Sequence, residues 1–194
     1  MKETVTVRFL GQCIPRNPGG IACYAYIIRN KEGLLLHESC GLAAEPNSPS
    51  STNTIANYTA LIKALEWLIK HRYTKDIIRV YGSSKLVISQ INDGEPFISS
   101  NKDAISKNVL PLYTRVIKMK SKFYYVSFEL ISGYGNSDID DKEVEELSLL
   151  AYIEAKAKIL NQSKNTPNSG TNKKEQELKL FSRAAELMMA TGNN

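Results

Sequence analysis

The sequence predicts an α/β protein with a mixed sheet covered by helices on both faces. The first part of the chain holds three successive β-type segments, and the rest follows the order α-β-α-α-β-α. Strands joined by short turns pair antiparallel, whereas strands separated by helices can pair parallel. The 194 residues suffice for one such domain plus an appendage, and 42% hydrophobic with 23% charged residues is typical of a globular protein.

Five segments have the pattern of β-strands. In the first, Val5, Val7 and Phe9 alternate with other residues, which is the two-residue period of a strand with one buried face. The second is a continuous β-branched and aromatic run after a turn rich in proline and glycine, so it should pair back antiparallel on the first. Gly33 separates it from the third. We expect strands over residues 4–9, 21–29, 34–38, 77–81 and 123–131.

Four further segments have helical patterns. Thr52 can cap the first helix, whose apolar residues recur at spacings of three and four at Ile55, Tyr58, Ile62, Leu65 and Ile69. The turn-forming residues after Ile91 should end the second helix. We expect the later helices over residues 83–91, 104–119 and 141–160.

The composition changes after residue 160. Residues 161–172 (NQSKNTPNSGTN) are polar, and such a segment cannot bury enough apolar area to offset its ordering entropy. Residues 173–190 regain an amphipathic helical pattern. We therefore expect a domain over residues 1–160, a flexible linker over 161–172 and a C-terminal amphipathic helix over 173–190.

Three segments carry a resemblance to a known family. They are FLGQC at residues 9–13, TNTIANYTAL at 52–61 and VYGSS at 80–84. Together they resemble the type 1 ribonuclease H family, whose corresponding patterns run roughly F-D-G, T-N-N-x-x-E and Y-G-D-S. GGIA at residues 19–22 and PLY at 111–113 resemble the archaeal-type branch. The resemblance implies a five-stranded mixed sheet, with three antiparallel strands and then two parallel ones.

The same resemblance implies two magnesium ions held by four acidic residues. In this chain three of the acidic positions hold Leu10, Asn57 and Ser83, and the fourth aligns with Glu145. Mg²⁺ prefers oxygen ligands, several of them carboxylates in paired-metal sites, and one carboxylate cannot hold a metal pair. We therefore expect a non-enzymatic protein, a pseudoenzyme with no catalytic residue, no metal and no cofactor.

Other titratable residues offer weaker alternatives. Asp138, Asp140 and Asp141 cluster before the last expected helix, either as a relocated metal site or as negative charge that caps a helix N-terminus. His37 and His71 fall in a strand and at a helix end, where a packed or surface histidine is the simpler interpretation than a ligand. Cys13, Cys23 and Cys40 have no metal-site spacing and favour a reducing compartment.

A nucleic-acid-binding surface is expected beside the former acid positions. The resemblance implies that Asn53 and Thr54 contact an RNA strand near its 2′-hydroxyls. Lys85 would point a cation toward a phosphate, and Ser84 directly before it belongs to the same expected surface. Arg16 lies on the first hairpin turn. An ordinary role in turns, caps and surface is the alternative for all five.

These observations lead to one functional prediction and two alternatives. We expect a catalytically inactive protein that binds RNA, DNA or an RNA–DNA hybrid within a nucleic-acid-processing complex, and the net charge of +5 favours an anionic partner. The first alternative is a scaffold subunit that docks a protein through the groove or residues 173–190, and the second is residual ribonuclease activity. With no signal-peptide pattern and no apolar run of ~18 residues, we expect a cytoplasmic protein without membrane contact.

Overall fold

A computed structural model describes residues 3–93, 107–131 and 139–164. The chain divides into two compact units, residues 1–152 and 153–194. The expected helix over residues 173–190 and most of the expected linker lie outside the described residues. The strands and helices, in chain order, are β1 (Thr4–Ile14), β2 (Ile21–Arg29), β3 (Leu35–Leu42), α1 (Asn53–Lys70), the short 3-10 helix η1 (Tyr73–Lys75), β4 (Ile77–Gly82), α2 (Lys85–Asp93), α3 (Leu110–Lys120), β5 (Tyr125–Leu130) and α4 (Ile139–Lys164).

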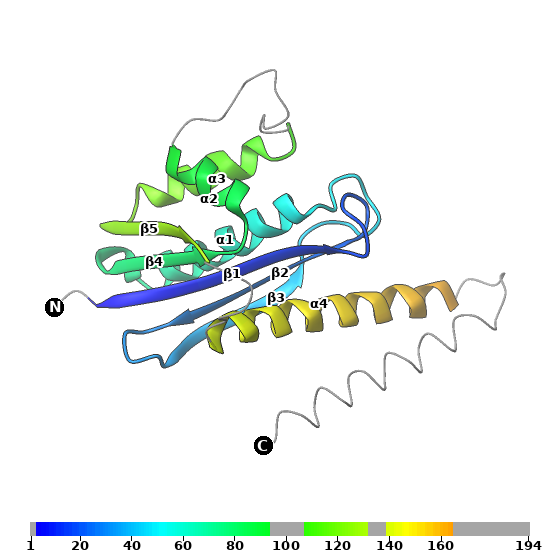
Figure 1. Cartoon of the computed structure of the whole chain (residues 1–194), viewed down its shortest axis with the longest axis horizontal. Coiled ribbons are helices and arrows are strands. Elements are labelled where there is room, and N and C mark those ends of the chain that lie inside the picture. Colours follow the sequence, from blue (N-terminus) through cyan, green and yellow to red (C-terminus); the bar gives the residue numbers. More distant parts are fainter. Residues whose placement is uncertain (1–2, 94–106, 132–138, 165–194) are drawn as a thin grey trace. The chain divides into compact units, whose positions relative to one another are not determined.

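The five strands form one mixed sheet in the order β3-β2-β1-β4-β5 (Figure 1). The hairpin-connected strands β1, β2 and β3 pair antiparallel, while β1 pairs parallel with β4 and β4 with β5. This confirms the expected sheet. One face of the sheet packs against α1, α2 and α3, and the first part of α4 packs on the other face.

The alternation in β1 explains how one strand serves both layers. Val5, Val7 and Phe9 are fully buried on the face that α1, α2 and α3 cover. Leu10 points to the opposite face, where it packs against the cluster that contains Val144 of α4. Side chains of successive strand residues point to opposite faces, so β1 links the two halves of the core.

Several element boundaries differ from the expected ones. The first strand runs to residue 14 rather than 9, because its pairing with β2 continues through Ile14↔Ile21. The third strand continues to residue 42. Residues 107–109 form a turn, so α3 begins later than the expected start at 104, with Pro111 in its first turn, where proline favours helix initiation. The fifth strand is shorter than expected, and α4 extends to residue 164, which makes the first four residues of the expected linker helical.

The N-terminus of α1 confirms the expected cap. The Thr52 Oγ1 accepts a hydrogen bond from the Ile55 backbone N–H at 3.1 Å, which satisfies one of the donors that a helix start leaves unpaired. Tyr58 and Leu65 are fully buried, as their helical spacing predicts. The cap therefore fixes where α1 begins relative to the loop before it.

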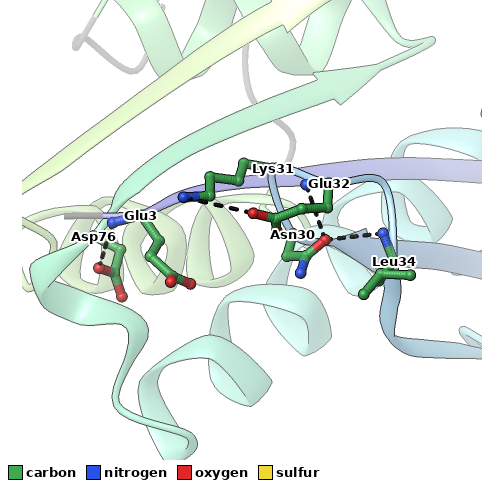
Figure 2. A network of polar contacts seen from close by, with 6 residues as sticks. All are labelled: Glu3, Asn30, Lys31, Glu32, Leu34 and Asp76. Atoms are coloured by element: carbon green, nitrogen blue, oxygen red, sulfur yellow. Dashed lines mark hydrogen bonds and ion pairs between the residues drawn. The ribbon is translucent and has the colours of Figure 1, made fainter. Parts of the chain in front are cut away.

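The turn between β2 and β3 depends on the side chain of Asn30, whose contacts Figure 2 shows, and on Gly33. Asn30 Oδ1 accepts hydrogen bonds from the backbone N–H groups of Glu32 (3.1 Å) and Leu34 (2.9 Å). Gly33 has a φ of +79°, a conformation that side chains disfavour. The break expected at Gly33 is therefore a tight turn.

Figure 2 also shows a contact between the N-terminal end of β1 and the chain before β4. The Glu3 N–H donates to Asp76 Oδ1 at 3.1 Å, which ties the start of β1 to the residue before β4.

Aromatic rings and two imidazoles stack between β3 and α1. His37 lies over Trp67 with 4.9 Å between ring centroids and an interplanar angle of 5°. His71, the residue that caps the C-terminus of α1, stacks on Trp67 at 4.1 Å. Both histidines therefore have packing partners in the strand and helix-end positions expected for them. Within the described residues, no helix is both long and apolar enough to cross a bilayer.

Candidate nucleic-acid interface

A cavity of about 490 Å³ opens where β1 and β4 end their pairing. The last pair between these parallel strands joins Phe9 to Gly82, and the chain then continues as Leu10–Gln12 on one side and Ser83–Ser84 on the other. Crevices beyond the carboxyl ends of parallel strands are common ligand sites. The lining residues are Leu10, Gly11, Gln12, Asn53, Asn57, Ser83, Ser84, Glu145 and Leu149.

Two asparagines of α1 complete the hydrogen bonding of β1 where it extends past β4. Asn57 Oδ1 accepts from the Gly11 N–H at 3.1 Å, and Asn57 Nδ2 donates to the Gly11 carbonyl at 2.8 Å. One turn earlier, Asn53 Oδ1 accepts from the Cys13 N–H at 2.5 Å. Buried backbone groups without partners cost free energy, so these amides replace a missing neighbouring strand. We name this arrangement the amide clamp.

Gly11 permits the close approach that the amide clamp requires. A Cβ at this position would lie 2.0 Å from the Asn57 backbone nitrogen and 2.3 Å from the Ala56 carbonyl carbon. Real Cβ contacts are far longer, so any larger residue would push α1 away from β1. The glycine in the FLG motif is therefore a packing requirement at the centre of the site.

Asn57 is nearly inaccessible to a ligand. Its side chain is buried, with 3% of the residue exposed, and Nδ2 also donates to the Asn53 carbonyl at 2.9 Å. Its amide oxygen and nitrogen are thus both occupied by the backbone. From the sequence alone, Asn57 could be described only as a neutral oxygen donor. Its contact with Gly11 could not be predicted, because the two residues are 46 positions apart in the chain.

The cavity lining holds one carboxylate, that of the exposed Glu145. Leu10 contributes an apolar side chain, and Ser83 contributes an exposed hydroxyl. Among the described residues, no group of three or more histidine, cysteine, aspartate or glutamate side chains could hold a metal ion. Asp141 instead pairs with Arg8 at 2.5 Å, and the other two aspartates of its cluster have no described side chains.

The expected binding residues fall into two groups. Asn53 and Ser84 line the cavity, whereas Arg16, Thr54 and Lys85 are not among its lining residues. The Arg16 Nε donates to the Gly19 carbonyl at 2.8 Å and so closes its own turn. Ser84 Oγ accepts from the Val87 N–H at 3.4 Å, a weak cap for α2, and the exposed Lys85 follows at the first helical position.

Contacts from neighbouring loops fix this surface. The Asn53 N–H donates to Asn17 Oδ1 at 3.0 Å, which ties the first hairpin turn to the start of α1. Cys13 Sγ lies 3.1 Å from the carbonyl oxygens of Arg16 and Ser51, and it can donate to them. Ser51 is itself fully buried and donates to the Gly20 carbonyl at 2.7 Å. The hairpin turn and the helix start therefore form one continuous edge.

Gln12 and Ser148 connect β1 to α4 and were not recognised in the sequence. Gln12 Nε2 donates to Ser148 Oγ at 2.8 Å, and Ser148 is fully buried. The sequence offered one indication of this contact, because Gln12 is two residues after Leu10 and therefore lies on the same face of β1.

The Cys23 thiol on β2 stays protonated. Burial, and secondarily the neighbouring thiols, raises its pKa to about 12.

Comparisons with known proteins agree with this architecture. Residues 16–140 match the reverse transcriptase-like family. The N-terminal RNase H domain of a Mycobacterium tuberculosis protein, solved as a fusion with maltose binding protein, is 22% identical with a TM-score of 0.63, over 81% of this chain and 99% of that one. RNase H1 from Halobacterium salinarum is 20% identical with a TM-score of 0.58, over 78% and 98%. LC11-RNase H1 from a compost metagenome, solved with an RNA/DNA hybrid, is 23% identical with a TM-score of 0.60, over 78% and 98%. The chain belongs to the reverse transcriptase-like family and has a ribonuclease H-like fold.

Proposed function

We propose that this protein binds nucleic acid without cleaving it. The binding surface, which we name the cavity edge, consists of Arg16 on the first hairpin turn, Asn53 and Thr54 at the start of α1, and Ser84 and Lys85 at the start of α2. The observation that carries the proposal is the convergence of Leu10, Asn57, Ser83 and Glu145 on one cavity. These are the four positions at which the family resemblance implies acidic residues. Three of the four lack a carboxylate, so the arrangement of the site is retained while its charge is not.

The donors present do not fit a pair of magnesium ions. Two ions a few ångström apart need strong negative charge to hold them together, and the cavity lining supplies one carboxylate. Leu10 has no donor atom, and both polar atoms of the Asn57 amide are held by backbone groups. Metal-dependent hydrolysis at this cavity therefore has no support in its side chains.

Three features support nucleic acid as the ligand. The cavity edge presents neutral hydrogen-bonding groups from Asn53 and Ser84, and the exposed Lys85 lies directly beyond them. Fewer carboxylates mean less repulsion of a phosphate backbone. The structurally similar LC11-RNase H1 was solved in complex with an RNA/DNA hybrid. Membership of the archaeal-type branch stays a prediction.

A cleavage assay tests the absence of catalysis. Purified protein is incubated with a labelled RNA–DNA hybrid and Mg²⁺ or Mn²⁺, beside a Glu145→Ala variant that removes the remaining carboxylate. We expect no cleavage by either protein. Metal-dependent turnover that the Glu145→Ala change abolishes would refute the proposal and restore the ribonuclease interpretation.

A binding titration tests the nucleic-acid surface. The double change Arg16→Ala and Lys85→Ala should weaken binding to all sequences about equally. It should also flatten the slope of log affinity against log salt by up to roughly 2 units, because about one counterion is released per phosphate contact. Ser84→Ala serves as the uncharged comparison. A parent protein that binds no hybrid, RNA or DNA at low salt would instead favour the scaffold function.

A further inference from the structure

A second cleft lies between the C-terminal parts of α1 and α3. It has a volume of about 450 Å³ and shares no lining residue with the cavity described above. Its lining residues are Glu66, Ile69 and Lys70 from α1, with Arg115, Lys118, Met119 and Lys122 from α3 and the residues just after it. The cleft thus combines four cationic side chains with one carboxylate.

The one carboxylate of this cleft is already engaged. Glu66 forms an ion pair with Arg115, which joins the two helices across the cleft. Lys70, Lys118 and Lys122 are exposed and form no ion pair within the described part of the chain. Three like charges that face one open cleft repel each other, and an anion placed among them would relieve that repulsion.

The spacing of the cations favours an extended anion over a single small one. Arg115 and Lys118 are three residues apart and therefore lie on one side of α3, and Lys122, in the turn after the helix, lines the same cleft. Lys70 flanks these cations from the end of α1. Ile69 and Met119 give the cleft an apolar component, against which lysine stems can pack while their charges face solvent.

Helix dipoles account for only part of this arrangement. Cations near a helix C-terminus are stabilising, and Lys70 and Lys118 lie in the last turns of their helices. Lys122 lies beyond the end of α3, and the dipole effect falls off within the last turn. The presence of Lys122 in the same cleft indicates that the positive charge of the cleft continues past the end of α3.

We propose that the α1–α3 cleft binds backbone phosphates of a nucleic acid, independently of base sequence. Lysine is a phosphate ligand that acts as a point charge, and such contacts dominate sequence-independent affinity. Lys70 is separated from Asn53 by the length of α1, which is about 26 Å at ~1.5 Å per residue. The cleft is therefore a contact additional to the cavity edge, and it does not depend on that edge binding anything.

The test is a salt titration of binding to a labelled RNA–DNA hybrid, followed by fluorescence anisotropy. The triple change Lys70→Gln, Lys118→Gln, Lys122→Gln should lower affinity at low salt and flatten the log–log slope by up to about 3 units. A matched control removes three exposed cations outside both linings through Lys75→Gln, Arg79→Gln and Lys158→Gln. Replacing the three cleft lysines by arginine should keep binding, which separates charge from folding.

Each outcome has one interpretation. Equal effects of the cleft and control changes would overturn the cleft proposal, since net charge alone would then explain binding. Loss of binding in the cleft variant with no effect of changing Arg16 and Lys85 would support the cleft and refute the cavity edge. A parent protein that binds no nucleic acid refutes both proposals. Lysine-dependent binding to phosphatidylserine-containing vesicles, without hybrid binding, would assign the cleft to a membrane surface instead.

Discussion

The amide clamp makes a sharp prediction for Asn57→Asp. The change preserves size and keeps an acceptor for the Gly11 N–H, but it replaces the Nδ2 donor by a carboxylate oxygen. That oxygen would face the carbonyl groups of Gly11 and Asn53, at the positions where Nδ2 now lies 2.8 and 2.9 Å away. The buried Gly11 carbonyl and the part-buried Asn53 carbonyl would each lose a donor and meet a negative charge.

The expected cost follows from these contacts. A buried polar group left without its partner costs about 1–3 kcal/mol, and the part-buried Asn53 carbonyl should add less, about 1–2 kcal/mol, so the loss is roughly 2–5 kcal/mol at neutral pH. For a domain of this size, that corresponds to a fall in Tm of about 4–20 °C. Burial and the facing carbonyls should raise the pKa of the new carboxyl, because both disfavour its charged form.

The pH dependence of the stability loss shows whether the charge of the new carboxylate causes it. A protonated carboxyl can donate to Gly11 again, so the gap in unfolding free energy between variant and parent should narrow as pH falls from about 7 to about 5. Urea unfolding at several pH values measures this gap. Ser83→Asp is the matched control, since it adds a carboxylate at an exposed position of the same cavity. An Asn57→Asp protein as stable as its parent at neutral pH would refute the amide clamp.

Three further predictions concern the core and the stacked rings. Leu10→Asp should lower the unfolding free energy by about 1–3 kcal/mol, since it places a charge in the apolar cluster against α4; an unchanged Tm would contradict that packing. Gly11→Ala should lower the free energy of unfolding by more than about 3 kcal/mol or prevent folding, because the added Cβ would overlap the α1 backbone. A variant that is well folded by circular dichroism would contradict this and show that α1 can move. Burial, and secondarily His71, lowers the pKa of His37, so this group makes the protein less stable as pH falls through about 6.5, where the unfolded chain protonates first. His37→Phe keeps the stack on Trp67 and should flatten the rise in stability between pH ~5 and ~7, and an equal slope in both proteins would rule this contribution out.

Local sequence patterns predicted which strands and helices form better than they predicted where these elements start and end. The alternation of Val5, Val7 and Phe9 and the Thr52 cap depend on neighbouring residues, so they are visible in the sequence. The extension of β1 to Ile14 is not visible there, because Leu10 and Gly11 interrupt the hydrophobic alternation in the sequence, although every second residue stays buried through Cys13 and pairing with β2 continues. Strand ends depend on partners that are distant in the chain.

The same distinction applies to the site. Family resemblance related Leu10, Asn57, Ser83 and Glu145 to one another, and the cavity lining brings them together. No pattern along the chain indicates that the Asn57 amide pairs with the backbone of Gly11, since this depends on how closely α1 approaches β1. The α1–α3 cleft could not be predicted either, because its lysines come from the end of α1 and from the end of α3 with the turn after it, which are far apart in the sequence.

The amide clamp also bears on how this protein can assemble. A strand that runs past its neighbour exposes backbone groups to which another chain could add, which is a common route to aggregation and to peptide capture. Here Asn53 and Asn57 occupy those groups on β1. Among the described strands, addition of a foreign strand is therefore directed to the outer edges of β3 and β5, each of which has one partner in the sheet. A ligand at the cavity would meet side chains rather than an open ladder of peptide groups.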